Sequence, residues 1–485
     1  MTLLLTMTLL AACSPSSQPF MIVPENDNPA EESTESVTER NYPTRPAYGP
    51  GELVEYIAQA GDTLPALAAR FNTTVEEIRT ANPIIPPDAT TMPPGMPMSI
   101  PIYYRALWGN PFQIVPDAVF VNGPDASTFN TAQFISQHPG WLQWYDAWAF
   151  KGTRTAAEII DYVGINYSIS PKILLALLDY QSGAFSKSEI SADEEYNVLG
   201  LESAYWTGVY LQLSYAANIL NDGYYRWRDG TLIEFELSDG TLVRPDPWQN
   251  AATVALQYFF SQTRTADDYH AAVGEEGFVQ TYLRLFGDPW TVEPHIAGSL
   301  KQPVMQLPYP KEDSWMFTGG PHTGWGNLEP FAALDFAPPL NETGCFPSSR
   351  PTTAVADGLI VRDGEGVLVL DLDGDGDEHT GWVVFYLHIA ARDRVPVGAS
   401  VSMGDFLGYP SCEGGHSTGT HIHIARKYNG EWVMASGVVP FVLSGWQPFR
   451  GDAAYSGYLV KDEMSVLANT HPDNRSAIPA EEVGE

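Results

Sequence analysis

The sequence predicts a multidomain chain: a small βααβ unit, a mainly α-helical middle region and an all-β C-terminal domain. The chain has 485 residues, more than the roughly 150 of one typical domain. Apolar residues recur with helical spacing in the middle of the chain, whereas runs of β-branched and aromatic residues punctuated by Gly fill the part after residue 298. On composition and pattern we divide the chain into six segments: residues 1–13, 14–50, 51–102, 103–297, 298–450 and 451–485.

Composition excludes some partners. The 59 acidic and 25 basic residues give a formal charge of −34, which disfavours binding that depends on neutralising phosphates, so we expect no nucleic-acid partner. The sequence contains no uncharged apolar run of about 18 residues, so we expect no helix that spans a bilayer.

The N-terminus is the segment that relates to a membrane. Residues 1–13 are apolar and end in Leu10-Ala11-Ala12-Cys13, which resembles a bacterial lipoprotein signal, although no Lys or Arg precedes Arg40. The resemblance implies that Cys13 carries a lipid anchor and that the protein is an extracytoplasmic lipoprotein of the cell envelope. The alternative is a cleaved secretion signal. Residues 14–50 are rich in Pro, Ser and Glu and are expected to form a flexible linker.

Residues 51–102 predict a strand, two short helices and a returning strand. The turn Gly61-Asp62-Thr63-Leu64, Asn82 and the ending Ser99-Ile100-Pro101 resemble a LysM module. The resemblance implies binding to N-acetylglucosamine-containing glycans such as peptidoglycan. The alternative is a small packing domain without a ligand.

Residues 103–297 are rich in Trp, Tyr and Ala and show helical spacing over 155–163 and 171–180, with Pro171 at a helix start. The run 169–183 resembles the first helix of lysozyme-like lytic transglycosylases, in which a Glu before Ser-Gly acts as the general acid. Gln181 occupies that position here, and an amide cannot supply a proton at neutral pH. We therefore expect a domain without glycan-cleaving activity, unless another carboxylate replaces the acid; the candidates are Asp179, Glu189 and Glu202.

Several aromatic residues of this region offer rings that could stack on sugars, although for most of them a place in the core is the favoured interpretation. They are Trp206, Tyr210, Tyr224, Tyr225 and Trp227.

The all-β region carries candidate metal ligands. His421 and His423 are two apart in a predicted strand and therefore project from the same face. Asp335 lies between Leu334 and Phe336, where its carboxylate is costly to desolvate without a cation. With His322 from the preceding loop, a His, Asp, His set with an open fourth position is typical of catalytic zinc.

The run Ser417-Thr418-Gly419-Thr420-His421-Ile422-His423, within residues 315–430, resembles the lysostaphin-type, LytM-like zinc endopeptidases that cut peptidoglycan peptides. The resemblance implies that His322, Asp335 and His423 bind Zn²⁺ and that His388 and His421 are an unligated catalytic pair. His322 and Asp335 are 13 positions apart, a spacing that is similar to the staphylolysin-like branch, and Ile424-Ala425 replaces the usual Glu.

Two further features concern cysteines and calcium. With Cys13 lipidated, Cys345 and Cys412 are expected to form a disulfide in an oxidising compartment, the alternative being two buried thiols. The loop Asp371 to Asp377 begins like a calcium loop, but Trp382 occupies the twelfth position, so a solvated hairpin tip is the favoured interpretation.

Together these features predict an exported, lipid-anchored zinc endopeptidase that hydrolyses peptide cross-links or stem peptides of peptidoglycan. Two alternatives remain open at this point. One is a non-catalytic peptidoglycan-binding regulator of other wall hydrolases, and the other is a glycan-cleaving enzyme that uses the helical domain.

Overall fold

A computed structural model describes residues 47–339, 344–471 and 473–480, which belong to one compact unit. The predicted lipidation site Cys13, the signal at residues 1–13 and all but the last four residues of the linker 14–50 lie outside the described residues. Across the described part of the chain, every helix is too short or too polar to cross a bilayer.

The first unit has the predicted βααβ order. Thr74 caps the second helix and exchanges hydrogen bonds with Glu77, which explains where that helix begins. The buried Asp62 of the predicted turn accepts hydrogen bonds from Tyr56 Oη (2.6 Å) and Arg70 Nη1 (2.8 Å), so it closes the turn. The elements are β1 (Glu52–Ile57), α1 (Leu64–Arg70), α2 (Val75–Ala81) and β2 (Pro97–Ile102), with β1 and β2 antiparallel.

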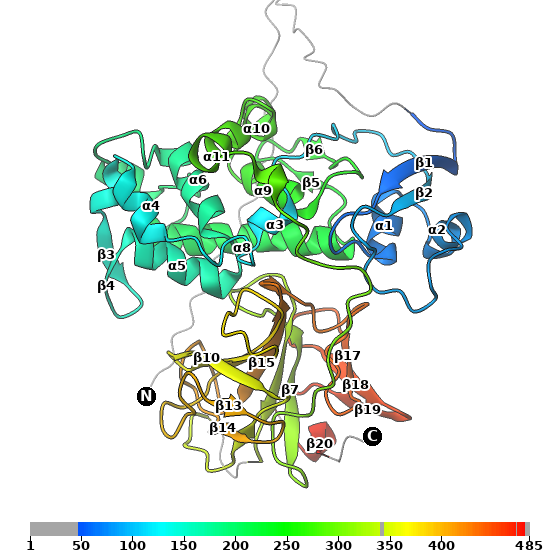
Figure 1. The fold of residues 1–485 in the computed structure, drawn as a ribbon, viewed down its shortest axis with the longest axis vertical. Coiled ribbons are helices and arrows are strands. Elements are labelled where there is room, and N and C mark those ends of the chain that lie inside the picture. Colours follow the sequence, from blue (N-terminus) through cyan, green and yellow to red (C-terminus); the bar gives the residue numbers. More distant parts are fainter. Residues whose placement is uncertain (1–46, 340–343, 472, 481–485) are drawn as a thin grey trace, which may run out of the picture. The chain divides into compact units, whose positions relative to one another are not determined.

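The middle region is mainly helical, as predicted (Figure 1). Its longest helix, α8, packs against α5 and α9. Pro171 begins α6 after the N-cap Ser170, and Gly183 ends it in the left-handed conformation (φ 68°). The elements are α3 (Asp117–Phe120), α4 (Thr131–Gln137), η1 (Trp141–Trp144), β3 (Asp146–Ala149), β4 (Gly152–Thr155), α5 (Ala156–Tyr167), α6 (Pro171–Ser182), α7 (Ala192–Tyr196), α8 (Gly208–Asp229), β5 (Phe235–Glu236), β6 (Leu242–Val243), α9 (Ala251–Ser261), α10 (Ala266–Val273), α11 (Phe278–Phe286) and η2 (Pro289–Thr291).

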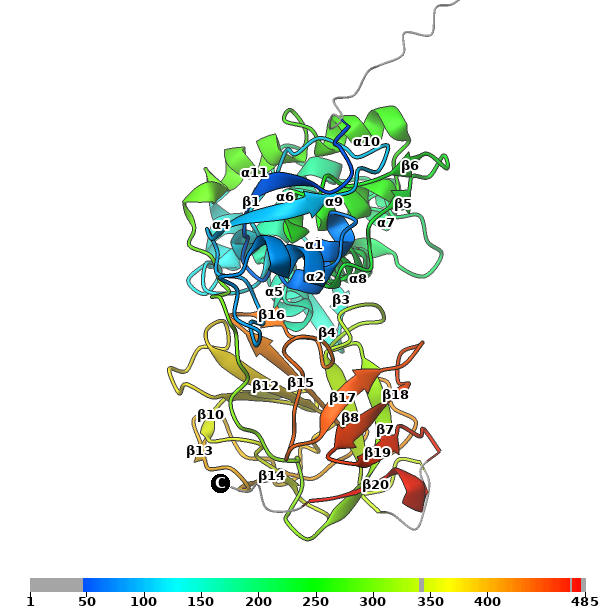
Figure 2. The ribbon, with the colours of Figure 1, turned by 90° about the vertical axis from the view of Figure 1, so that its right-hand side faces the viewer.

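The C-terminal region is built on one large sheet (Figure 2). Its path runs β13-β10-β11-β12-β15-β8-β7-β20, and β16 pairs with β15 off this path. The elements are β7 (Ser314–His322), β8 (Ala333–Ala337), β9 (Thr352–Thr353), β10 (Gly358–Gly364), β11 (Val367–Asp371), β12 (Trp382–Leu387), β13 (Ser400–Val401), β14 (Phe406–Gly408), β15 (Ile422–Tyr428), β16 (Glu431–Trp432), β17 (Gln447–Arg450), β18 (Gly457–Lys461), β19 (Met464–Leu467), η3 (Asn474–Ser476) and β20 (Ala477–Pro479).

The two faces of this sheet bury different sets of side chains. Leu334 and Phe336 of β8 and Ile424 of β15 pack into a core within the C-terminal region. Phe385 of β12 and Ala425 of β15 point the other way, since side chains alternate along a strand, and they join the core of the helical region. Helices therefore cover part of the sheet face that carries Asp335 and His423.

The described residues after 450, a segment to which the sequence assigns no role, are part of the fold. Strands β18 and β19 of this segment form a three-stranded sheet with β17, and β20 pairs with β7 at the edge of the large sheet. Its apolar residues Leu459 and Ile478 are buried. These strands are short and alternate polar with apolar residues, so only the partner strands reveal their register.

A buried ionic cluster joins the helical region to the sheet. Glu431 of β16 accepts hydrogen bonds from Tyr224 Oη (2.7 Å) and Arg228 Nη2 (3.1 Å) of α8. His295 Nε2 lies 2.6 Å from the same carboxylate, and Arg228 also pairs with Asp117 (3.2 Å). Burial alone would raise the pKa of Glu431, but Arg228 and His295 lower it to about 2.

Candidate functional site

Three neighbouring strands bring the predicted ligands together. His423 of β15 lies directly opposite Asp335 of β8 in the antiparallel register, and Asp335 pairs in turn with Gly319 of β7. Irregular pairing between Gly319 and His322 then places the His322 side chain on the same site. A Cβ on Gly319 would lie 2.6 Å from Asp335 Oδ2, so glycine is needed there for the carboxylate to fit.

The three side chains form a compact set of donor atoms. His322 Nε2 lies 2.9 Å from His423 Nδ1 and 3.2 Å from Asp335 Oδ1, and His423 Nδ1 lies 3.3 Å from Asp335 Oδ1. Ligands on a tetrahedral Zn²⁺ with bonds of about 2.1 Å are separated by about 3.4 Å. The observed separations fit such an ion.

Hydrogen bonds fix which ring nitrogens face the centre. His322 Nδ1 lies 2.8 Å from Gly320 O, and His423 Nε2 lies 3.1 Å from Gly324 O. A carbonyl only accepts, so these nitrogens carry the protons and the opposing nitrogens present lone pairs. Two lone pairs at 2.9 Å beside a carboxylate repel unless a cation lies between them, and Asp335 Oδ1 is buried without a hydrogen-bond donor.

The electrostatics of this cluster agree with a cation site. Burial raises the pKa of Asp335, but the His322 and His421 rings lower it well below its usual value, so the carboxylate is ionised. Burial lowers the pKa of His423, which favours the neutral ring that can bind a metal. The described residues thus bring His322, Asp335 and His423 together as a candidate metal centre.

His388 and His421 lie beside this centre with their ring centroids 4.5 Å apart. His388 Nδ1 lies 2.8 Å from Glu413 O, and His421 Nδ1 lies 2.8 Å from Gly419 O, so both rings have Nε2 unprotonated when neutral. His421 Nε2 lies 3.7 Å from Asp335 Oδ2. Burial and the His421 and His423 rings lower the pKa of His388 to about 3.

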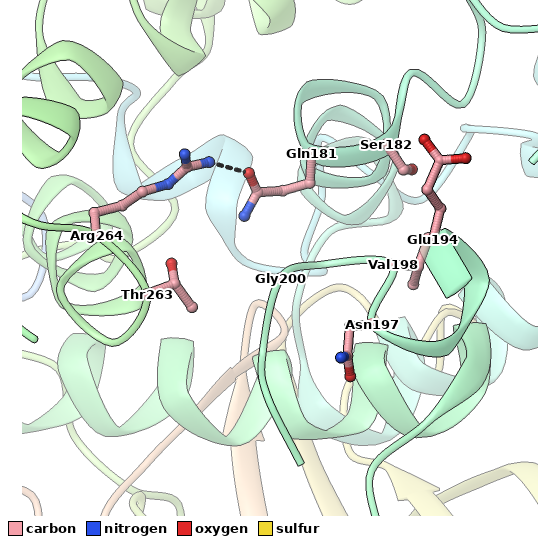
Figure 3. A pocket seen from close by; sticks show the side chains of 8 residues that line it. All are labelled: Gln181, Ser182, Glu194, Asn197, Val198, Gly200, Thr263 and Arg264. Carbon is pink, nitrogen blue, oxygen red and sulfur yellow. Dashed lines mark hydrogen bonds between the residues drawn. The ribbon is translucent and has the colours of Figure 1, made fainter. Parts of the chain in front are cut away.

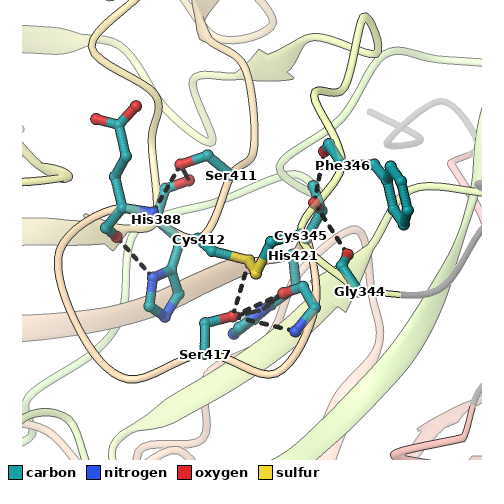
Figure 4. Close-up of a disulfide and its surroundings, with 11 residues drawn as sticks. Gly344, Cys345, Phe346, His388, Ser411, Cys412, Ser417 and His421 are labelled. Carbon is teal, nitrogen blue, oxygen red and sulfur yellow. Dashed lines mark hydrogen bonds between the residues drawn. A yellow bond between two sulfur atoms is a disulfide. The ribbon is translucent and has the colours of Figure 1, made fainter.

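The expected disulfide between Cys345 and Cys412 is present and lies next to the histidine pair (Figure 4). Ser411 Oγ donates to His388 O (2.9 Å), and Thr420 N, just before His421, donates to Gly344 O (3.0 Å). The crosslink therefore ties together the segments that hold His388 and His421.

Tyr455 is a site residue that the sequence analysis missed. Its ring stacks on His322 with centroids 4.1 Å apart, from the turn between β17 and β18. This residue belongs to the segment after 450, and one Tyr among polar and small residues gives no signal of its position.

The candidate metal centre opens into a groove with a volume of about 1680 Å³. The groove is lined by His322, Asp335, His388, His421 and His423 and also by residues of the helical region. The exposed loop with His416 forms part of its rim.

The position of the missing general acid is occupied by a fixed amide (Figure 3). Gln181 donates from Nε2 to Leu199 O (2.7 Å), and its Oε1 accepts a hydrogen bond from Arg264. The pocket around Gln181 has a volume of only about 250 Å³. Both ends of the amide are used by the fold.

The carboxylates considered as replacements lie in other settings. Asp179 is buried, pairs with Arg284 and accepts from Phe185 N (2.7 Å), while Glu189 and Glu202 are exposed. None of the three lines the Gln181 pocket.

The acidic loop after β11 brings three carboxylates within 4.8 Å of one another: Asp371, Asp373 and Asp375. Asp371 Oδ2 accepts from Gly376 N (2.9 Å) and Asp373 Oδ1 from Asp375 N (3.3 Å). These turn hydrogen bonds account for the arrangement, and calcium binding there stays the less favoured alternative to a hairpin tip without an ion.

Family models match two segments. The LysM domain model matches residues 56–101, and the model of the LasA N-terminal domain matches residues 113–301. The helical region is thus similar to the LasA N-terminal domain, and its likeness to lytic transglycosylases stays a prediction.

Known proteins match much of the chain. Protease LasA of Pseudomonas aeruginosa is 27% identical over 376 residues, which cover 70% of this chain and 78% of that protein. The beta-lytic metalloendopeptidase of Lysobacter enzymogenes is 30% identical over 163 residues, which cover 31% of this chain and 83% of that protein. Among solved structures, the M23 metalloprotease pseudoalterin from the deep sea has a TM-score of 0.30 at 23% identity and covers 35% of this chain and 98% of its own. The chain therefore belongs to the beta-lytic metalloendopeptidase family and is a metallopeptidase with a LysM domain and a LytM-like peptidase domain.

Proposed function

We propose that this protein is a zinc endopeptidase that hydrolyses peptide bonds of peptidoglycan. His322, Asp335 and His423 hold the Zn²⁺, and His388 and His421 are its catalytic pair. The observation that carries the proposal is the set of three acceptor atoms within 3.3 Å of one another whose lone pairs converge on one point.

The chain's own residues move the proton. When bound, Zn²⁺ acts as a Lewis acid on the attacking water and on the scissile carbonyl. His421 Nε2 accepts the proton of the water, since its Nδ1–H is held by Gly419 O. His388 is neutral near pH 7, so it donates to the developing oxyanion or to the leaving amine only after Nε2 gains a proton. The groove beside both rings supplies room for an extended peptide.

The substrate class is supported by two independent parts of the chain. The LysM domain is expected to bind N-acetylglucosamine-containing glycan. The relatives of the peptidase part are named as the protease LasA and as beta-lytic metalloendopeptidases. A LysM domain bound to the glycan raises the local concentration of peptide at the metal centre. We propose the domain limits 51–102, 103–297 and 298–450, with the strands up to residue 479 added to the last domain.

We further propose that the protein is exported and anchored through a lipid on Cys13, with residues 14–50 as a tether. Metabolic labelling with an alkyne fatty acid tests this proposal. We expect label on the wild-type chain and none on Cys13→Ser, and equal labelling of the two would contradict the anchor.

Product analysis on purified peptidoglycan tests the function. We expect new free amino groups without new reducing or anhydro sugar ends. New sugar ends would instead indicate glycan cleavage. No products of either kind, with wall binding retained, would indicate a non-catalytic regulator.

A further inference from the structure

The groove at the metal centre has a second wall that comes from the helical region. Tyr162 and Tyr167 of α5, Trp206 before α8, and Tyr210 and Ser214 of α8 line the same groove as the metal-centre residues. We call the four rings of Tyr162, Tyr167, Trp206 and Tyr210 the aromatic wall. None of the four is charged, because burial raises the pKa of Tyr162 and Tyr167 to about 12 and also raises that of Tyr210.

A series of rings connects the aromatic wall to the metal centre. Tyr162 packs edge-on against Trp325 with centroids 6.5 Å apart, and Trp325 packs against Phe385 at 6.0 Å. Phe385 is in turn 6.4 Å from the His423 ring. Phe385 is buried, so these rings link the two sites through the core, whereas the groove that both sites line makes them parts of one surface.

Tyr167 of the aromatic wall is buried in the core, but the other three rings of the wall differ from the core aromatics of the same helices. Tyr224, Tyr225 and Trp227 are buried and serve the core. Trp206 and Tyr210, by contrast, are half-buried and lie at the groove. Trp206 stacks on Tyr215 with centroids 5.6 Å apart and planes 23° apart, so the plane of its ring is fixed before any ligand binds.

We propose that the aromatic wall is a saccharide subsite that binds a neutral N-acetylated hexosamine unit of the substrate while the attached peptide lies at the metal centre. Fixed aromatic rings with phenol hydroxyls suit the apolar face and the hydroxyl groups of a sugar ring. This inference rests on the proposed function, because it extends the substrate of the same groove.

The charge of the groove favours a neutral sugar over an acidic peptide. Among the described residues that line it, none is Lys or Arg, whereas Asp335 and Asp473 contribute carboxylates. A peptide segment rich in carboxylates would find no cationic partner on the aromatic wall. A neutral saccharide needs none.

Saccharide binding by the full-length protein tests the subsite without relying on activity. Calorimetric titration with tri-N-acetylchitotriose is done on the wild type, Trp206→Ala and Trp206→Phe. We expect Trp206→Ala to bind one saccharide fewer per chain and Trp206→Phe to restore that site. Trp144→Ala is the matched control, because Trp144 is 78% exposed on the helical region and does not line the groove.

Cleavage of two matched substrates gives a second readout. One is a peptidoglycan fragment with the disaccharide still attached to the peptide, and the other is the same peptide with an acetyl group in place of the sugar. We expect Trp206→Ala to lower kcat/KM about tenfold on the sugar-bearing substrate and to leave kcat/KM on the acetylated peptide unchanged.

The outcomes separate this inference from the proposed function. The subsite would be overturned if Trp206→Ala binds as many saccharides per chain as the wild type. It would also be overturned if Trp206→Ala keeps the wild-type melting temperature but loses kcat/KM equally on both substrates. If wild-type protein cleaves neither substrate, the proposed function fails, while the titration still decides whether the aromatic wall binds sugar.

Discussion

His423 on β15 lies directly opposite Asp335 on β8, and His423 Nδ1 is 3.3 Å from Asp335 Oδ1. Strand pairing, rather than a flexible loop, therefore sets the distance between these two groups. A shift of one residue in register would send one of the side chains to the opposite face of the sheet. The sheet thus pre-organises the candidate metal centre, at the cost of burying a carboxylate that needs a cation.

The histidine pair and the metal ligands should have separable effects. His421→Ala and His388→Ala remove the groups that we propose to move protons, so we expect kcat to fall about 10²- to 10⁴-fold. Zinc content should stay at the wild-type level, because His322, Asp335 and His423 are untouched. Steady-state kinetics and metal analysis on the same samples check this, and loss of zinc in His421→Ala would place that residue among the ligands.

The disulfide is expected to support activity more than metal binding. The double variant Cys345→Ser with Cys412→Ser lacks the crosslink between two segments. One segment places Glu413 O against His388 Nδ1, and the other holds the backbone just before His421. We expect a loss of about 2–5 kcal/mol in the free energy of unfolding and a fall of about tenfold or more in kcat. Zinc stoichiometry should not change, since the proposed ligands come from strands of the large sheet. Unaltered kcat in the double variant would show that the sheet alone positions the pair.

The helical region should influence metal affinity through one loop. Asn218 Oδ1 of α8 accepts from Asn327 N (2.7 Å), which secures the loop whose Gly324 carbonyl faces His423 Nε2. Because such partners orient a metal-binding histidine, we expect Asn218→Ala to weaken zinc binding about tenfold in competition with a chelator.

Asn221→Ala provides the matched control for that loop. Asn221 is also a buried asparagine of α8, but its side chain donates to Tyr167 O (2.9 Å) rather than holding the loop. An effect of the loop on zinc affinity would be excluded if Asn218→Ala binds zinc as tightly as the wild type. It would also be excluded if Asn218→Ala and Asn221→Ala lose the same zinc affinity.

The ionic cluster predicts how stability depends on pH. The pKa of Glu431 is about 2 in the folded protein and near 4.5 when unperturbed. A lowered pKa means that the carboxylate stabilises the fold above about pH 4.5 and that this contribution is lost as pH falls towards 2. The contribution of this carboxylate to the free energy of unfolding at pH 7 corresponds to about 3 kcal/mol.

Glu431→Gln should therefore be less stable than the wild type at pH 7, and the difference should shrink below pH 4.5. Acid and urea unfolding followed by near-UV circular dichroism measures this. Glu365→Gln is the control, because Glu365 pairs with Lys151 at the surface and such pairs contribute little. A difference that is the same at pH 3 and pH 7 would assign the effect to packing instead.

The sequence carried enough information for the elements whose local chemistry is explicit. Ser170-Pro171 and Gly183 mark the limits of α6, and the period-two placement of His421 and His423 indicates a shared face. Asp335 between two apolar residues could be recognised as a carboxylate in need of a cation. The two cysteines that remain once Cys13 is set aside as the expected lipidation site predicted the disulfide.

Other features depend on contacts between distant segments and left no local signal. Tyr455 reaches His322 only because β17 and β18 place their turn there, and the strands after residue 450 gain their register from β7 and β17. The shared groove exists because one face of the sheet packs on the helical region. Nor does the sequence show that Arg264 and Leu199 fix the amide of Gln181.

Zinc stoichiometry of the purified full-length protein, measured by mass spectrometry of metals beside an Asp335→Ala variant, tests the central claim most directly. The account predicts one zinc per wild-type chain and almost none in Asp335→Ala, with a wild-type fold by circular dichroism after the metal is removed from both. A full complement of zinc in Asp335→Ala would contradict it.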